Sequence, residues 1–356
     1  MISKPGALFI GPLPPPHHGQ AASTLDLLTR LLEDGVALKL VDTNDGPGSK
    51  LSGVVNRMMR HLKAAANIAK HSQTSVYVSV NANAGMILTA ALAGLARRRG
   101  HNIILHHHTR GHLQPGHKNL GRLVKAAGSD AVHICICPSM AEDLMRAAPG
   151  VQATLAYSNV NVVDSALRQL PLKTMPPAHE RTLGHLSNLT IEKGLERVIE
   201  CFRIARNSGK AKRLIVAGPL GGPREKALVS ESAVEFGSDF EWLGPIYGDA
   251  KRDFFKMIDV FLFPSLYKHE TQGIVNLEAL ASGCPVAAYA ICCISSDLQG
   301  SAAVAIPSDR DFPSEAMKFL DSLDASAPIQ ARGRFDELLT ANVEQYNSIK
   351  AALEDR

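Results

Sequence analysis

The sequence has no uncharged apolar run of the ~20 residues that a helix needs to span a bilayer. It also lacks paired CxxC spacings among its six cysteines, which argues against a structural zinc site, and its first residues do not follow a signal-peptide pattern. Aromatic residues make up only 5% of the chain, so few side chains are available to stack on nucleic-acid bases. We therefore expect a protein of a reduced cytosolic setting that binds no nucleic acid and is either soluble or peripheral at the inner face of the membrane.

Length and charge indicate two domains of different character. A chain of 356 residues exceeds what one hydrophobic core usually serves, and 45% hydrophobic with 20% charged residues is an ordinary globular composition. Residues 1–160 hold 16 Lys and Arg against 8 Asp and Glu, whereas the remainder holds 22 against 26. A basic front half indicates an anionic partner, and the charge alone does not distinguish nucleic acid from an acidic membrane leaflet.

Strand-like apolar runs alternate with helical patterns from end to end. In the first half the predicted strands are Ala7–Gly11, Leu38–Asp42, Ser75–Val80, Asn102–His106 and Val132–Cys137. In the second half they are Thr182–Leu186, Arg213–Ala217, Phe240–Leu243, Val260–Pro264, Pro285–Tyr289 and Ala302–Ile306. The alternation predicts an α/β protein with two Rossmann-like, doubly wound domains that face each other across a cleft.

Proline placement sets the expected domain limits. The stretch 166–181 contains Pro171, Pro176 and Pro177 with little periodicity, so we interpret it as a linker. Residues 1–165 then form an N-terminal, acceptor-side domain, and residues 182–335 form a C-terminal domain that binds a nucleotide. Residues 336–356 are expected to be a helix that returns to pack on the first domain.

The stretch "KHETQGIVNLEALASGCP" at 268–285 carries the main functional signal. In open α/β sheets ligands lie beyond the carboxyl ends of the strands, where the first turn of the next helix presents backbone N–H groups. Gly273 lets a phosphate approach the backbone closely, and Ile274 and Val275 provide N–H donors at the positive end of the helix dipole. A diphosphate fits this position.

Two carboxylates flank that position. Glu278 lies more than one turn inside the predicted helix, where it can accept both hydroxyls of a ribose. Glu270 precedes the helix and reaches the group attached beyond the diphosphate. The spacing matches the two ends of a nucleotide-sugar, although a solvated helix face is the plainer explanation for two glutamates.

These residues resemble the E-x7-E motif of retaining glycosyltransferase family 4, the group 1 glycosyl transferases, which have the GT-B fold. The likeness extends in order over the second domain through "LSNLTIEKG" at 186–194, "LIVAGP" at 214–219, "EWLGPI" at 241–246 and "DVFLFPS" at 259–265. The resemblance implies that Lys193 binds donor phosphate and that the backbone around Leu243 holds the base. The family's usual arginine is Asn188 here, which donates only neutral hydrogen bonds. An exposed lysine at 193 and a core-packing Trp242 are the alternatives.

Two candidates lie in the first domain. The proline-rich loop Gly11–Gln20 is similar to the family's glycine loop, and Gly19 would meet the donor phosphates there, although an ordinary surface turn has the same composition. His106 and His108 point the same way if the strand continues, and the resemblance places His108 near the transferred sugar. We expect no essential metal, because a strand offers only two histidines on one side and Asp309–Asp311 is better explained as a helix cap.

The stretch 50–71 predicts a basic amphipathic helix. It places Leu51, Val55, Met58, Leu62, Ala65 and Ala69 at helical spacing, together with five Lys and Arg residues and no acid. Such a helix either lies on an anionic membrane surface or packs on its own sheet with a solvated basic face. Arg97–Arg99 and the stretch 110–125 add further positive charge to the same domain.

The resemblance implies a metal-independent hexosyltransferase without a cofactor, which moves a sugar from a nucleoside-diphosphate sugar to a lipid-linked or polysaccharide acceptor of cell-surface glycan synthesis. The alternative is a non-catalytic GT-B subunit that holds a nucleotide-sugar or scaffolds a membrane complex. Asn188 and the glycine-free run Ile291–Ser296 favour this alternative. The sequence names neither the base nor the sugar.

Overall fold

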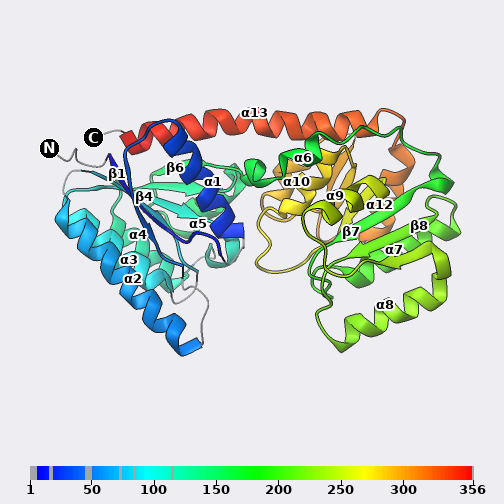
Figure 1. Cartoon of the computed structure of the whole chain (residues 1–356), viewed down its shortest axis with the longest axis horizontal. Helices are drawn as coiled ribbons and strands as arrows, with labels where there is room; N and C mark the ends of the chain where they lie inside the picture. The colour runs from blue at the N-terminus through cyan, green and yellow to red at the C-terminus, as the bar shows by residue number, and fades with distance from the viewer. Residues whose placement is uncertain are drawn as a thin grey trace. The chain divides into compact units, whose positions relative to one another are not determined.

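The computed structural model describes residues 6–15, 19–44, 50–71, 74–82, 85–113, 116–300 and 302–354, without the side chains of 50–55 and 57. The chain divides into two compact units, residues 1–162 with 341–356 and residues 163–340 (Figure 1). Each unit is built on a six-stranded parallel sheet, so the doubly wound α/β fold is as the alternation predicts.

The first sheet has the strand order β2-β1-β3-β4-β5-β6. Its strands are β1 Ala7–Gly11, β2 Leu38–Asp42, β3 Ser75–Ser79, β4 Asn102–His107, β5 Val132–Cys135 and β6 Ala153–Ala156. The sequence reasoning missed β6, which is only half buried and carries two alanines, so it has neither a strong apolar run nor β-branched side chains beyond Thr154.

Helices cover both faces of this sheet (Figure 1). They are α1 Gly19–Glu33, α2 Lys50–Lys70, α3 Gly85–Arg98, α4 Lys118–Ala127 and α5 Pro138–Ala147, with the short turns η1 Arg110–His112 and η2 Asn159–Val162. The core on one face joins α1 to the chain's last helix, because Leu27 and Leu31 pack with Phe9, Ile349 and Leu353. That helix, α13 Ala327–Glu354, gives its last part to the first unit and its first part to the second.

The second sheet has the order β12-β11-β10-β7-β8-β9. Its strands are β7 Thr182–Leu186, β8 Arg213–Ala217, β9 Phe240–Trp242, β10 Val260–Phe263, β11 Val286–Tyr289 and β12 Ala303–Ile306. Counted from β7 this is the order 3-2-1-4-5-6 of dinucleotide-binding sheets. The direction of winding reverses between β7 and β10, so the loops after these two strands are expected to hold a ligand.

The remaining helices belong to the second unit. They are α6 Ser165–Arg168, α7 Leu195–Asn207, α8 Pro223–Phe236, α9 Asp249–Met257, α10 Ile274–Ser282, α11 Ile294–Asp297 and α12 Phe312–Ser322, with the turns η3 Ala178–Glu180 and η4 Gly237–Asp239. Asp311 caps α12 by accepting from the backbone N–H of Ser314 at 3.0 Å, so the capping interpretation is confirmed. None of the helices in the described ranges combines the length and the apolar character that spanning a bilayer requires.

A chain of three buried histidines lies within the first unit. His107 Nδ1 is 3.0 Å from His112 Nε2, and His107 Nε2 is 3.0 Å from His133 Nδ1, so β4, η1 and β5 are joined by imidazole hydrogen bonds. Each bond needs one protonated and one bare nitrogen, and three neutral rings provide both bonds. Burial lowers the pKa of His112 and of His133 to about 4 and holds the pKa of His107 well below 6.5.

We predict that the free energy of unfolding falls as the pH drops from about 6.5 toward 4. His112 and His133 stay neutral in the folded chain, whereas both are protonated in the unfolded chain at pH 5. Each residue therefore lowers the free energy of unfolding by about 2 kcal/mol between pH 7 and pH 5. Urea unfolding midpoints at the two pH values measure this loss. A His133→Leu variant should show a smaller loss, and a variant of the exposed His179, His179→Ala, should show the full one. Equal midpoints of the wild type at pH 7 and pH 5 would contradict the prediction.

Candidate functional site

A pocket of about 290 Å³ opens in the second unit at the point where its sheet reverses winding. The loop after β7, the loop after β10 and the first turns of α10 contribute to its wall. Seven of the ten residues proposed from the sequence line it: Asn188, Lys193, Glu270, Gly273, Ile274, Val275 and Glu278. The stretch with the E-x7-E spacing therefore surrounds one cavity, and its two glutamates do not lie on a solvated helix face.

The first turn of α10 forms one side of the pocket. Gly273 is the N-cap residue with φ 61°, in the left-handed region, and a Cβ there would approach Asn276 Nδ2 to 2.8 Å. Glycine therefore permits both the turn and the close backbone approach. Ile274 and Val275 follow as the first helical residues, whose backbone N–H groups have no partner inside the helix and carry the positive end of its dipole. This end of α10 favours an anion in the pocket.

Glu270 is almost buried and is held by two donors. Lys193 Nζ lies 2.6 Å from Glu270 Oε2, and Ser265 Oγ donates to the same oxygen at 2.9 Å. The Lys193 ammonium also lies 4.8 Å from the centre of the Tyr267 ring. A buried carboxylate needs such a cation and hydrogen bonds to offset its desolvation. Lys193 is consequently a pocket residue, and the alternative of an exposed surface lysine is wrong.

A second glycine places Lys193 beside the loop after β10. Gly194, the N-cap of α7, has φ 94°, and a Cβ there would lie 2.4 Å from the carbonyl oxygen of Pro264. Only glycine lets the turn after β7 come this close to the end of β10. The dipole of α7 disfavours a cation just before its N-terminus, and the ion pair with Glu270 offsets that cost.

Glu278 forms the second ion pair of the pocket. Lys251 Nζ, from the first turn of α9, lies 2.7 Å from Glu278 Oε1. Only 7% of Glu278 is exposed, so this carboxylate also depends on its cation. The sequence reasoning missed Lys251, because no motif marks it and only the packing of α9 against α10 brings it to the pocket.

The remaining wall differs in part from expectation. Further lining residues are Gly218, Pro219, Ile246 and Tyr247. Leu243 is not among the lining residues, and its backbone N–H donates to the carbonyl of Val216 at 3.0 Å. Trp242 is 40% exposed, so it is not a core residue. Its indole Nε1 donates to the carbonyl of Gly218 at 3.0 Å and thereby fixes the backbone of this wall.

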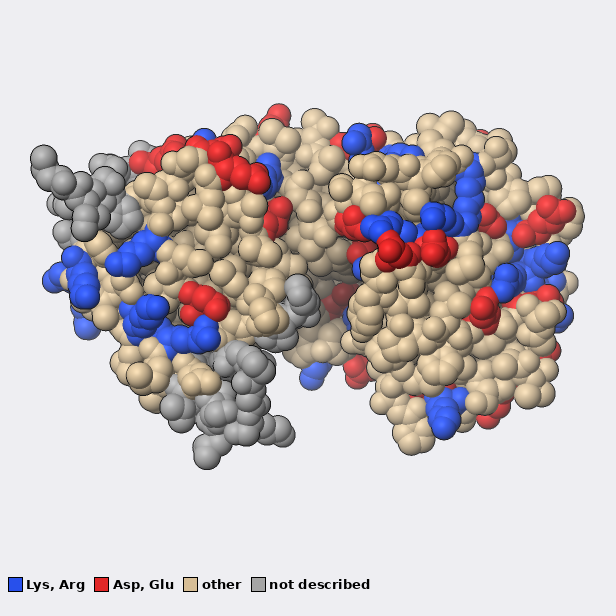
Figure 2. Space-filling model, viewed as in Figure 1, with Lys and Arg blue, Asp and Glu red and all other residues tan. Residues whose placement is uncertain are grey.

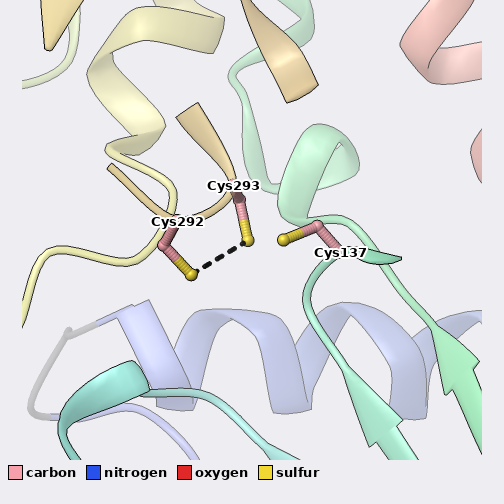
Figure 3. A group of neighbouring side chains, drawn as sticks. All are labelled: Cys137, Cys292 and Cys293. Atoms are coloured by element: carbon pink, nitrogen blue, oxygen red, sulfur yellow. Dashed lines mark hydrogen bonds between the residues drawn. The ribbon is translucent and has the colours of Figure 1, made fainter. Parts of the chain in front are cut away.

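The run Ile291–Ser296 contains no glycine, but one of its residues has a backbone conformation that favours glycine. Cys292 has φ 48°, the one positive φ of a non-glycine residue in the described part of the chain. Its Sγ lies 3.9 Å from that of Cys293, and both side chains are labelled in Figure 3. The Cys293 backbone N–H donates to the carbonyl of Thr271 at 2.9 Å, so this run supports the loop that carries Glu270.

The first unit places Gly19 and the histidines near the carboxyl end of its own sheet. Gly19 begins α1, and the neighbouring Gln20 donates through Nε2 to Ser79 Oγ at 2.9 Å, while residues 16–18 of the proline loop lie outside the described residues. The rings of His106 and His108 have centroids 3.9 Å apart, so the two side chains share a face as the strand alternation predicts. His106 is fully buried and bonded to the Tyr77 hydroxyl at 2.7 Å, which makes it a core histidine.

The pocket residues all lie in a stretch of the chain that matches a known family model. Residues 172–305 match the family model of glycosyl transferases group 1. An alpha-monoglucosyldiacylglycerol synthase of Streptococcus pneumoniae is 28% identical over 165 residues, which are 43% of this chain and 36% of that relative. The chain thus matches little more than a third of the length of this curated relative.

Solved structures resemble the chain over nearly its whole length. Sucrose-phosphate synthase of Thermosynechococcus elongatus has a TM-score of 0.70 at 14% identity and covers 98% of both chains. The Anabaena protein HepE, solved with UDP-glucose, has a TM-score of 0.62 at 16% identity and covers 97% of this chain and 99% of its own. The chain therefore has the GT-B fold, and its residues 172–305 resemble the glycosyl transferases group 1 family.

Proposed function

We propose that the protein is a retaining hexosyltransferase of family 4, which transfers a sugar from a nucleoside-diphosphate sugar to a lipid-linked or polysaccharide acceptor. The observation that carries the proposal is the pair of almost buried carboxylates on either side of the N-terminal end of α10, each held by a lysine. A donor spans these groups with its diphosphate at Gly273, its ribose at Glu278 and its sugar at Glu270.

Transition-state stabilisation follows from the charges of the pocket. The diphosphate gains negative charge as the bond to the sugar breaks, and the N–H groups of Ile274 and Val275 are already oriented toward it. Lys193 supplies the positive charge beside them. Asn188 lines the same wall and adds a neutral donor where the family resemblance implies an arginine.

Donor binding changes the partner of Lys193. The structure pairs its ammonium with Glu270 at 2.6 Å. A diphosphate at the end of α10 competes for that ammonium, and Glu270 then keeps Ser265 Oγ and gains lone pairs for a sugar hydroxyl. The exchange couples recognition of the diphosphate to recognition of the sugar. The roles of Gly19 with the donor phosphates and of His108 with the transferred sugar stay predictions from the sequence.

The acceptor side is proposed to lie on an anionic membrane surface through α2. This helix buries His61, Ala64, Asn67 and Ile68 in its own unit, and it exposes 57% of Met58, 62% of Met59 and 59% of Leu62. Lys63 and Lys70 are exposed on the same helix. In Figure 2 Lys and Arg side chains gather over the part of the first unit in which Figure 1 labels α2, α3 and α4. Exposed apolar side chains beside lysines fit a headgroup layer better than water.

The family relatives indicate which donors to examine first. HepE was solved with UDP-glucose, and the Streptococcus pneumoniae relative is named for a glucosyl lipid product. UDP-hexoses are therefore the first donors to test. We propose that no cofactor takes part and that the donor is a substrate.

A non-catalytic subunit that holds a nucleotide-sugar is the second candidate. The observation in its favour is the weaker cationic wall around Asn188, which is exposed and uncharged where a second phosphate clamp is expected. Firm binding of a nucleotide-sugar without slow release of nucleoside diphosphate would select this candidate.

We predict that a nucleoside diphosphate or its sugar raises the melting temperature of the protein and that Glu278→Gln abolishes the shift. A ligand that binds only the folded state stabilises it by mass action, and in the variant one of the two oxygens that accept from the ribose is replaced by an amide NH2 donor. Thermal-shift assays over UDP-, GDP- and ADP-sugars measure this. The matched control is Glu337→Gln, because Glu337 is exposed on α13 away from the pocket residues. An undiminished shift in Glu278→Gln would contradict the ribose assignment.

We also predict that EDTA leaves turnover unchanged. The lysine and the helix end provide the positive potential that a divalent cation supplies elsewhere. Release of nucleoside diphosphate from the preferred donor is measured with and without the chelator. A loss of turnover that added Mg²⁺ or Mn²⁺ restores would show that the proposal of a metal-independent reaction is wrong.

For α2 we predict binding to vesicles that contain anionic lipid. The double substitution Met59→Ser with Leu62→Ser should weaken binding about tenfold or more, because two exposed apolar side chains no longer enter the headgroup layer. Vesicle co-sedimentation measures the partition. Val234→Ser on α8 is the control, since Val234 is 87% exposed and lies in the other unit. Equal binding of the double variant and the wild type would exclude α2 as the contact.

A further inference from the structure

We propose that Lys251 is a positioning residue for Glu278 and through it determines the preference of the pocket for a ribose that carries both hydroxyls. The inference rests on the proposed function, because it takes the ribose to be the partner of Glu278. It adds a residue of α9 to a site that the loops after β7, β8, β9 and β10 and the helix α10 also line.

The contact between the two residues is exclusive. Lys251 Nζ lies 2.7 Å from Glu278 Oε1, and both side chains line the pocket. In the described part of the chain neither residue makes another side-chain hydrogen bond or ion pair. The lysine side chain is 29% exposed and the glutamate side chain 10%, so the carboxylate is the group that depends on the pair.

Lys251 is anchored on a rigid element. The helix α9 buries Phe254 and Phe255 completely or nearly so, and the Phe255 ring packs at 6.0 Å from that of Phe261 in β10. Lys251 lies one turn before these residues, in the first turn of the helix. A donor on a helix that is fixed to the central strand holds its acceptor more closely than a donor on a loop does.

The geometry divides the two oxygens of Glu278. Oε1 accepts from Lys251, which fixes the plane of the carboxylate and leaves Oε2 and one lone pair of Oε1 for a ligand. The two neighbouring hydroxyls of a ribose can each donate a hydrogen bond to one of these remaining acceptor positions. Without the lysine the carboxylate is free to rotate and its cost of burial is no longer offset, so the hydroxyl pair loses a fixed acceptor.

The test compares ligands that differ only in the hydroxyls. Affinities are measured by calorimetry for UDP, GDP and ADP, and then for the 2′,3′-dideoxy analogue of the best of the three. The proteins are the wild type, Lys251→Met, Lys251→Arg and, as the matched control, Lys256→Met, since Lys256 is a half-exposed lysine of the same helix paired only with Asp253. Melting temperatures of the free proteins show that each variant is folded.

We expect Lys251→Met to weaken binding of the ribose ligand about tenfold and to leave binding of the dideoxy analogue within about twofold. Lys251→Arg should restore most of the loss, and Lys256→Met should behave as the wild type. A purely electrostatic or structural role predicts an equal loss for both ligands, and that result would overturn the inference.

The outcomes also separate this inference from the proposed function. If the wild type prefers the ribose ligand and Lys251→Met keeps the same preference, Lys251 does not position Glu278 and only this inference is wrong. If the wild type binds none of the three nucleoside diphosphates, both the proposed function and the inference are wrong.

Discussion

Two carboxylates lie almost buried around the N-terminal end of one helix, and the cost of burying them determines much of the second unit. A carboxylate out of water needs a cation and hydrogen bonds, and each of these two has a lysine from a different element. Lys193 reaches Glu270 because Gly194 lets the turn after β7 approach Pro264. Lys251 reaches Glu278 because α9 is anchored by Phe254 and Phe255. The strand order 3-2-1-4-5-6 brings these elements to one place.

The charged side chains of the pocket balance one another, which bears on the kind of ligand that it binds. Two lysines and two glutamates leave no net charge among the paired side chains, so the attraction for an anion comes from the end of α10 and from the release of Lys193. A ligand must offer an anion for Lys193 and hydroxyls for the glutamates at the same time. A nucleotide-sugar satisfies both requirements, whereas inorganic phosphate satisfies only the first.

Much of the fold and the core of the site could be predicted because local signals agreed with the tertiary structure. The run Val260–Pro264 followed by a glycine and a helix indicated a ligand end of a strand, and eleven of the twelve strands have bounds within two residues of the predicted ones. The misses depend on packing that no local pattern encodes. Lys251 and Ser265 join the site only through contacts, and β6 has too few apolar or β-branched residues to stand out.

The orientation of α2 was equally hidden in the sequence. The apolar spacing of Met58 and Leu62 could have marked either a face packed on the sheet or a face left open. The structure buries the neighbouring face with Ala64 and Ile68, so the apolar spacing that was visible in the sequence belongs to the exposed side. Which face of a helix is buried depends on the element that packs against it, and the periodicity of the sequence alone does not indicate which element that is.

The most direct measurement of the central claim is a crystal structure of the protein with a bound nucleoside diphosphate. The account predicts phosphate oxygens within about 3 Å of Lys193 Nζ and of the backbone N–H groups at the start of α10, with ribose hydroxyls on Glu278 and the Lys251 contact kept. Phosphates bound away from α10, or a ribose that makes no contact with Glu278, would contradict it.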